Sequence, residues 1–131
     1  MNLTEIITNP EIVKAYFTFD PNLNGINLHE INIHRDGPTA KLRFDLSEFP
    51  DKPPRKWHSS YNTAQMTISL IDIEQIQLNG FNTTETGNLS FALEKEKILF
   101  SFKSKTCSFN GKCSFINVEK ISGYVNAEQQ H

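Results

Sequence analysis

From residue 26 onward, apolar and polar residues alternate, and this pattern limits the possible folds more than any other feature of the chain. Every second residue is apolar in KLRFDL at 41–46 and in AQMTISL at 64–70. Successive side chains of a strand point to opposite faces, so each such strand has one buried face and one face in water. About seven or eight strands of this kind are predicted over 26–125. The sequence therefore predicts a mostly β fold: an antiparallel up-and-down meander, curled or partly closed.

A short helix is expected before the strands. Asn9, Pro10 and Glu11 form a typical helix start, with a capping residue, a proline at the first helical position and an acid in the first turn. Apolar residues then recur at helical spacing from Ile12 to Phe17. We predict a helix over 10–17 and a loose tail over 127–131. The length of 131 residues is typical of a single domain, here residues 1–131.

The pair Asn110-Gly111 predicts a two-residue hairpin turn. In that register Cys107 and Cys113 face opposite sides of the sheet and cannot bond to each other. We therefore expect two thiols without a disulfide, as is usual in a reducing compartment.

Residues 49–57, FPDKPPRKW, raise a separate question. The spacing P-x-x-P-x-R is one that Src-homology-3 grooves accept from extended peptides. An architectural role is the favoured interpretation, because prolines cannot donate ladder hydrogen bonds and they stiffen a long connection. We predict that Phe49, Pro53, Pro54 and Trp57 clamp this connection to the sheet.

The charge pattern excludes some classes of partner. A formal charge of −2 does not favour nucleic acid, which selects a basic surface. The chain starts without a signal peptide and lacks a long apolar run, so no membrane span and a cytoplasmic location are expected. Residues 72–96 hold five acids against one lysine, and residues 97–120 hold five lysines against one acid. These two segments are expected to attract each other across neighbouring strands.

No catalytic constellation or metal motif is found in the sequence. His29, Glu30 and His34 resemble a zinc motif, but the spacing has one residue too many and the segment is predicted to be a strand. His58 is a candidate base for a cysteine nucleophile, and nothing in the sequence places it beside a thiol. The acids Asp72 and Glu74 share a strand face, which solvent-facing acids also do. We predict a binding module that is not an enzyme and needs no cofactor.

Three segments carry a resemblance to a known family. They are RDGPTAKLRFDLSEFPDKPPRKW at 35–57, LIDIEQIQLNGF at 70–81 and CSFINVEKISGYVN at 113–126. Their order and spacing closely resemble the immunity protein 50 family of bacterial polymorphic toxin systems, over about 28–126. The resemblance implies a mostly β antidote that stays in the cytoplasm and binds a toxin encoded beside it. It would block the active site of the toxin or hold the toxin in an inactive form.

If that toxin is a nuclease with a basic cleft, the antidote would offer acids and aromatic rings. The acidic segment supplies a candidate interface: Asp72, Glu74, Phe81, Glu85 and Glu94. A carrier of small apolar molecules or lipids is the alternative function, because a curled sheet with ten phenylalanines could enclose such a ligand. The sequence leaves open the identity of the toxin and the oligomeric state.

Overall fold

The computed structural model describes residues 2–83 and 85–128, and the side chain of Glu85 is not among the described groups. Two short helices precede the strands: α1 (Leu3–Ile6) and α2 (Pro10–Lys14). The strands are β1 (Ile26–His34), β2 (Thr39–Asp45), β3 (Thr63–Ile71), β4 (Gln75–Asn79), β5 (Glu85–Glu94), β6 (Lys97–Lys103), β7 (Ser108–Cys113) and β8 (Phe115–Tyr124). The prediction of a mostly β fold with a short N-terminal helix is confirmed.

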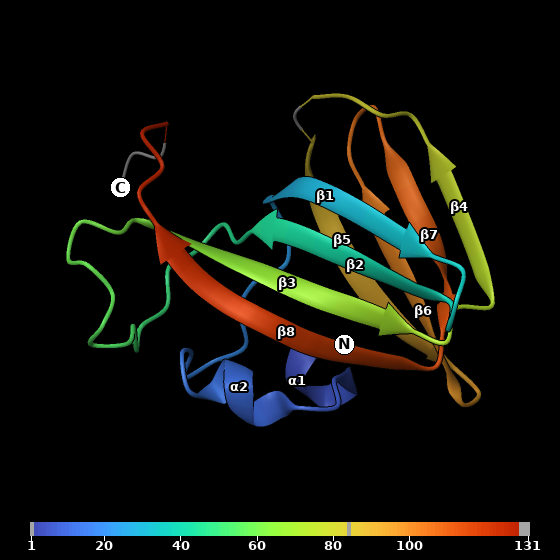
Figure 1. The fold of residues 1–131 in the computed structure, drawn as a ribbon, viewed down its shortest axis with the longest axis horizontal. Coiled ribbons are helices and arrows are strands. Elements are labelled where there is room, and N and C mark those ends of the chain that lie inside the picture. Colours follow the sequence, from blue (N-terminus) through green and yellow to red (C-terminus); the bar gives the residue numbers. More distant parts are fainter. Residues whose placement is uncertain (1, 84, 129–131) are drawn as a thin grey trace.

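The described strands form one antiparallel sheet in the order β4-β7-β6-β5-β1-β2-β3-β8. The sheet is curled, because β1 pairs with β5 only at Ile26, Asn27 and Leu28. It therefore folds into two layers: β1, β2, β3 and β8 run across the strands β5, β6, β7 and β4 that lie behind them (Figure 1). This order departs from that of a simple meander, because β3 pairs with β8 and β4 pairs with β7.

The core fills the space between the two layers. Most strands turn their alternate apolar residues inward, as the sequence pattern predicts, whereas Ile33 of β1 and Leu78 of β4 are exposed. The largest side chains that are almost completely buried are aromatic: Phe44, Phe100, Phe102 and Phe109. Phe100 and Phe109 are in ring contact, with centroids 5.4 Å apart. Phenylalanine rings from both layers therefore occupy the interior that a carrier would need for its ligand.

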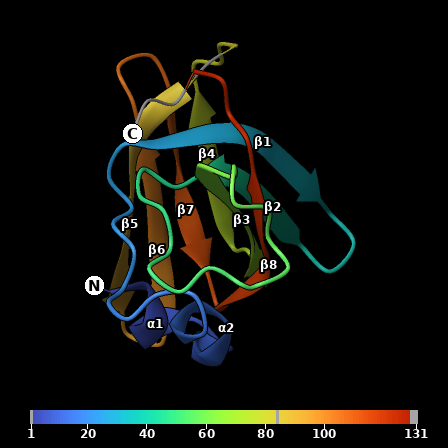
Figure 2. The ribbon, with the colours of Figure 1, turned by 90° about the vertical axis from the view of Figure 1, so that its left-hand side faces the viewer.

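The N-terminal segment covers the outer edge of β8. Ile7 forms a parallel bridge with Ile116, and the amide of Thr8 donates to the carbonyl of Ile116 at 2.8 Å. In Figures 1 and 2, both helices lie together at the lower end of the molecule, next to β8. The predicted helix over 10–17 is found as α2 plus one further turn, in which the Phe17 amide donates to the Val13 carbonyl at 3.0 Å. The sequence did not predict α1.

Asn110 and Gly111 do not form the predicted hairpin turn. Both lie inside β7, where Asn110 pairs with Gln77 of β4 and Gly111 with Ile76. A Cβ atom on Gly111 would lie 2.0 Å from the carbonyl oxygen of Gln75, so the glycine permits close approach of β4. The turn is instead at 104–107, where the Ser104 amide donates to the Cys107 carbonyl at 2.9 Å.

This correction changes the placement of the cysteines. Cys107 and Cys113 are an even number of residues apart and both are buried, so they do not face opposite sides of the sheet. Neither forms a disulfide, as predicted. They cannot bond because they are too far apart: six residues of strand separate the two cysteines by roughly 20 Å. Within the described chain, no helix has the length and apolar character that crossing a lipid bilayer requires.

Candidate functional site

The acidic candidates lie beside lysines of neighbouring strands. Lys97 Nζ is 3.0 Å from Glu74 Oε1 and 3.8 Å from Asp72 Oδ2, and Lys112 Nζ is 3.1 Å from Glu94 Oε1. We call these five residues the acid–lysine cluster. The predicted attraction between the acidic and basic segments is therefore confirmed for three ion pairs.

Hydrogen bonding to Glu74 raises the pKa of Lys97, and the charges of Glu74, Asp72 and Glu96 act in the same direction. Ser114 extends the contact: its hydroxyl accepts from Lys97 Nζ at 2.8 Å and donates to Asp72 at 2.6 Å. The acids of this cluster therefore face the solvent with lysine partners already in place.

The other two interface candidates lie elsewhere. Phe81, with 73% of its surface exposed, is on the connection from β4 to β5. The backbone of Glu85 begins β5 and Glu94 ends it, so strand geometry separates the two by roughly 30 Å. The side chain of Glu85 lies outside the described groups. The five predicted interface residues therefore do not form a single compact patch.

The proline-rich connection over 46–62 lies against β8 and α2. The ring of Trp57 is in contact with Tyr16, Phe49 and Tyr61, at centroid distances of 5.5, 5.8 and 6.1 Å. A Cβ atom at Gly123 of β8 would lie 2.7 Å from Cε3 of Trp57, so the indole sits directly on the strand backbone. In Figure 2, this connection (light green) runs across the end of the two layers that faces the viewer.

Hydrogen bonds hold the same connection to the helical segment. The amide of Lys52 donates to the Tyr16 carbonyl at 3.0 Å, and the Asp51 carboxylate accepts the amide of Thr18 at 2.9 Å. Bonds from the hydroxyl and amide of Thr18 lower the pKa of Asp51. Of the four predicted clamp residues, Phe49 and Trp57 thus touch each other, whereas Pro53 is exposed and Pro54 half-buried.

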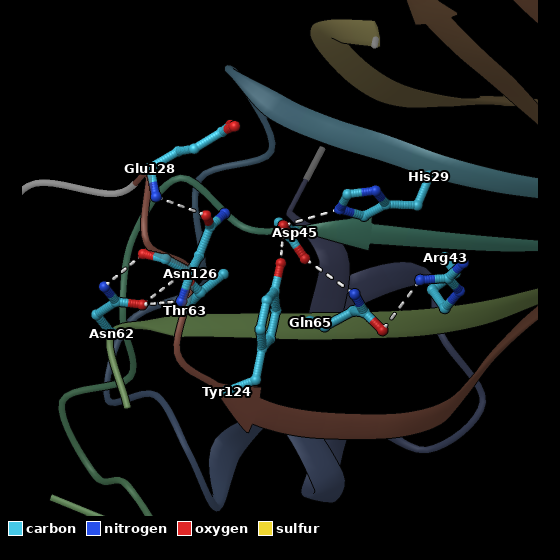
Figure 3. A network of polar contacts seen from close by, with 9 residues as sticks. All are labelled: His29, Arg43, Asp45, Asn62, Thr63, Gln65, Tyr124, Asn126 and Glu128. Carbon is cyan, nitrogen blue, oxygen red and sulfur yellow. Dashed lines mark hydrogen bonds and ion pairs between the residues drawn. The ribbon is translucent and has the colours of Figure 1, made fainter. Parts of the chain in front are cut away.

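A buried carboxylate is the feature that the sequence analysis missed. Asp45, at the end of β2, is 1% exposed and lies on the outer face of its layer. It accepts hydrogen bonds from His29 Nε2 at 2.8 Å, from Gln65 Nε2 at 3.0 Å and from the hydroxyl of Tyr124. Figure 3 shows the three donors converging on Asp45, with Arg43 joined through Gln65.

The β-bulge in β1 explains how His29 reaches this carboxylate. The pairing of β1 with β2 shifts between Leu28 and Glu30, so His29 is the extra residue of the bulge. Burial, and then the bond to Asp45, raise the pKa of Tyr124 to about 12, so Tyr124 remains a donor at neutral pH. In the alternating sequence pattern, Asp45 stands at a position that is expected to face solvent. The pattern therefore gives no signal that its side chain is buried.

Comparison with known proteins decides the family. The sequence model of one family, described as Immunity protein 50, matches residues 9–124. The chain belongs to the immunity protein 50 family. Comparison with curated proteins gave no match, and comparison with solved structures gave none either.

The match extends beyond the three segments that first suggested the immunity protein 50 family. It begins at Asn9, so it includes α2 but not Ile7 and Thr8, which contact Ile116 of β8. It ends at Tyr124, the last residue of β8 and a partner of Asp45. The whole described sheet and the Asp45 network therefore lie within the family region.

This member of the immunity protein 50 family does not bring His58 to a thiol. The Nδ1 atom of His58 lies 2.6 Å from the hydroxyl of Ser60, in the exposed proline-rich connection. Cys113 is buried, and that burial raises its thiol pKa to about 11, which disfavours a thiolate nucleophile. Among the described residues, no three His, Cys, Asp or Glu side chains gather as metal ligands.

Proposed function

We propose that this protein neutralises a polymorphic toxin encoded next to it, by binding the toxin in the cytoplasm and inhibiting it. The observation that carries the proposal is the match to the immunity protein 50 family over residues 9–124. Immunity requires tight association, because a few unbound toxin molecules can kill the cell. Toxin–immunity pairs reach affinities near the limit for non-covalent complexes.

The neighbouring gene provides the direct test. The toxin domain that it encodes is expressed from an inducible promoter, with or without this protein, in a host that lacks both. We expect growth arrest with the toxin alone and normal growth with both proteins. Growth arrest that persists although both proteins are made would reject the proposal.

An acidic contact with a basic toxin cleft remains our proposal for part of the interface. It involves Asp72, Glu74, Phe81, Glu85 and Glu94. The lysine partners of the acid–lysine cluster weaken the field that these acids present, since opposite charges in close contact largely cancel at a distance. If the acids steer the toxin, then Glu85→Lys with Glu94→Lys should weaken binding, most strongly at low salt. Equal affinity of this variant and the wild type across a range of salt would remove these two acids from the interface.

The carrier alternative has less support. A hollow beside Leu23 and Phe91 holds about 360 Å³ and is open to solvent. The interior between the layers is filled by phenylalanine and other apolar side chains. A lipid would therefore need to displace core side chains in order to enter.

A further inference from the structure

Two hollows that follow one another along β1 form a groove between this strand and residues 73–83, which include β4 (both strands are labelled in Figure 1). One part of it lies between Ile33 at the end of β1 and Ile76 of β4, and holds about 330 Å³. A second, narrower part lies between Ile31 of β1 and Phe81 after β4. The groove therefore follows β1 along the half of the strand that does not pair with β5.

Both strands present backbone that no described residue pairs with. The pairing of β1 with β5 ends at Leu28, which leaves the outer edge of Glu30–His34 open. Strand β4 is the last strand of the sheet order, and its outer edge is open as well. The opposite end of the sheet is different, because the N-terminal segment covers β8 there through the bridge of Ile7 to Ile116.

Strand β4 lacks the usual protection of an open edge. Its sequence QIQLN contains no charged residue and no proline, and its register with β7 is regular. Natural proteins usually place a lysine, a proline or a bulge on such an edge to prevent pairing with another chain. An unprotected edge of this kind is a template for an added strand.

Apolar side chains lie along the groove: Ile31, Ile33 and Ile76 line it, and Leu78 is the next residue after Ile76 on the same face of β4. Leu78 is 41% exposed and shares a face of β4 with Ile76, while Ile33 is 49% exposed and shares a face of β1 with Ile31. Phe81 stands at the far end. A strand laid along this groove would therefore meet apolar contacts at alternate positions.

The charges along the groove are mostly neutralised. Glu30 pairs with Arg43 at 3.3 Å and Glu74 pairs with Lys97 at 3.0 Å. Arg35, at the tip of the β1–β2 hairpin, lines the groove and has no ion pair in the described part of the chain. The groove is therefore complementary to an apolar segment that carries an acid at one end.

The two hollows of this groove hold no described residue. A second copy that paired β4 with β4 about a two-fold axis would cover one edge and leave the β1 edge open. An inserted extended segment can cover both sides of the groove.

We propose that the groove between β1 and β4 binds an extended segment of the cognate toxin by strand addition to β4. The segment has apolar side chains at alternate positions and an acidic residue where it meets Arg35. This proposal rests on the proposed function and specifies the surface that carries it out.

Titration of an inactivated form of the neighbouring toxin domain into matched variants tests the proposal. Leu78→Glu places a charge on the face of β4 from which Ile76 lines the groove. Leu93→Glu is its control, because Leu93 is an exposed leucine (57%) at the end of β5. We expect Leu78→Glu to weaken binding about 30-fold or more, as for a central contact, and Leu93→Glu to change it by less than about 3-fold. Arg35→Glu should weaken binding less, and mainly at low salt.

Amide hydrogen exchange on the wild-type complex gives a second readout that depends on no variant. We expect the outward-facing amides of Glu30–His34 and Gln75–Asn79, which do not bond to β2 or β7, to gain protection in the complex. If Leu78→Glu fails to fold, this exchange measurement decides the question.

The outcomes separate the two levels of the proposal. Tight binding by the wild type, with equal binding by Leu78→Glu and protection elsewhere, would overturn the groove as the site and leave the immunity function standing. A dimer of the protein alone that Leu78→Glu dissociates would assign the groove to a second copy and also overturn the proposal. If the wild type neither binds nor neutralises the toxin, the proposed function itself fails. The proposed binding of a toxin segment in the groove then fails with it.

Discussion

Asn9 illustrates how one side chain can act as a piece of strand. The sequence suggested that it caps α2, but its amide group instead donates to the Val118 carbonyl at 2.8 Å and accepts from the Val118 amide at 3.0 Å. These are the two bonds that a neighbouring backbone would make. Asn9 therefore extends the contact of the N-terminal segment along β8 by one further position.

Replacing Asn9 should destabilise the fold. We expect Asn9→Ala to lower the free energy of unfolding by about 2 kcal/mol, because both polar groups of the Val118 backbone lose their partner. Urea denaturation followed by circular dichroism measures this change. Asn32→Ala is the matched control, since Asn32 is exposed on β1, and it should change stability by less than about 0.5 kcal/mol. Equal effects of the two variants would contradict this role for Asn9.

Tyr124 links stability to pH in the alkaline range. Its pKa is raised from 10.0 to about 12, so the folded protein holds this proton more tightly than the unfolded chain does. The resulting stabilisation is fully present below pH 10 and is lost as the pH rises toward 12. Lysines also titrate in this range, so the informative quantity is the difference in unfolding free energy between the wild type and Tyr124→Phe. We expect that difference to shrink between pH 10 and pH 12, and a constant difference would argue against the bond to Asp45.

At the scale of elements, the proline-rich connection and β8 depend on each other through Trp57 and Gly123. Trp57→Ala should cost about 2 kcal/mol, less than for a fully buried indole because the ring is half-buried. Gly123→Ala should also destabilise the wild type, since the added methyl group would overlap the indole. Thermal unfolding of both single variants and the double variant gives the coupling. We expect Gly123→Ala to cost less in the Trp57→Ala background, and purely additive effects would contradict the contact.

The alternation of apolar and polar residues located the strands, because a strand with one buried face needs an apolar residue at every second position. It could not identify neighbours, since the pattern tells which face is buried and not which strand lies alongside. Asn110-Gly111 was misread for a related reason: the same glycine permits a turn or the close approach of another strand. Asp45 was missed because polar residues on an outer face follow the same pattern whether other side chains cover them or not.

At the scale of the whole molecule, one edge strand of the sheet is covered and the other is not. The N-terminal segment protects the β8 edge, whereas the β4 edge remains open. Deleting residues 1–9 should therefore expose a second unprotected edge and promote self-association, which open strand edges favour. Light scattering at several protein concentrations measures this effect. The full chain under the same conditions is the control, and a monomeric deletion variant would contradict the protective role of the segment.

The bridge between the N-terminal segment and β8 also sets an order of events during synthesis. The hydroxyl of Thr8 bonds to Asn117, a partner 109 positions later in the chain. The ribosome works from the N-terminus, so this segment emerges before β8 exists and must wait for β8 before it can dock. Any messenger that ends early leaves this segment without its partner. The N-terminal segment can therefore take its place in the fold only after β8 has been synthesised.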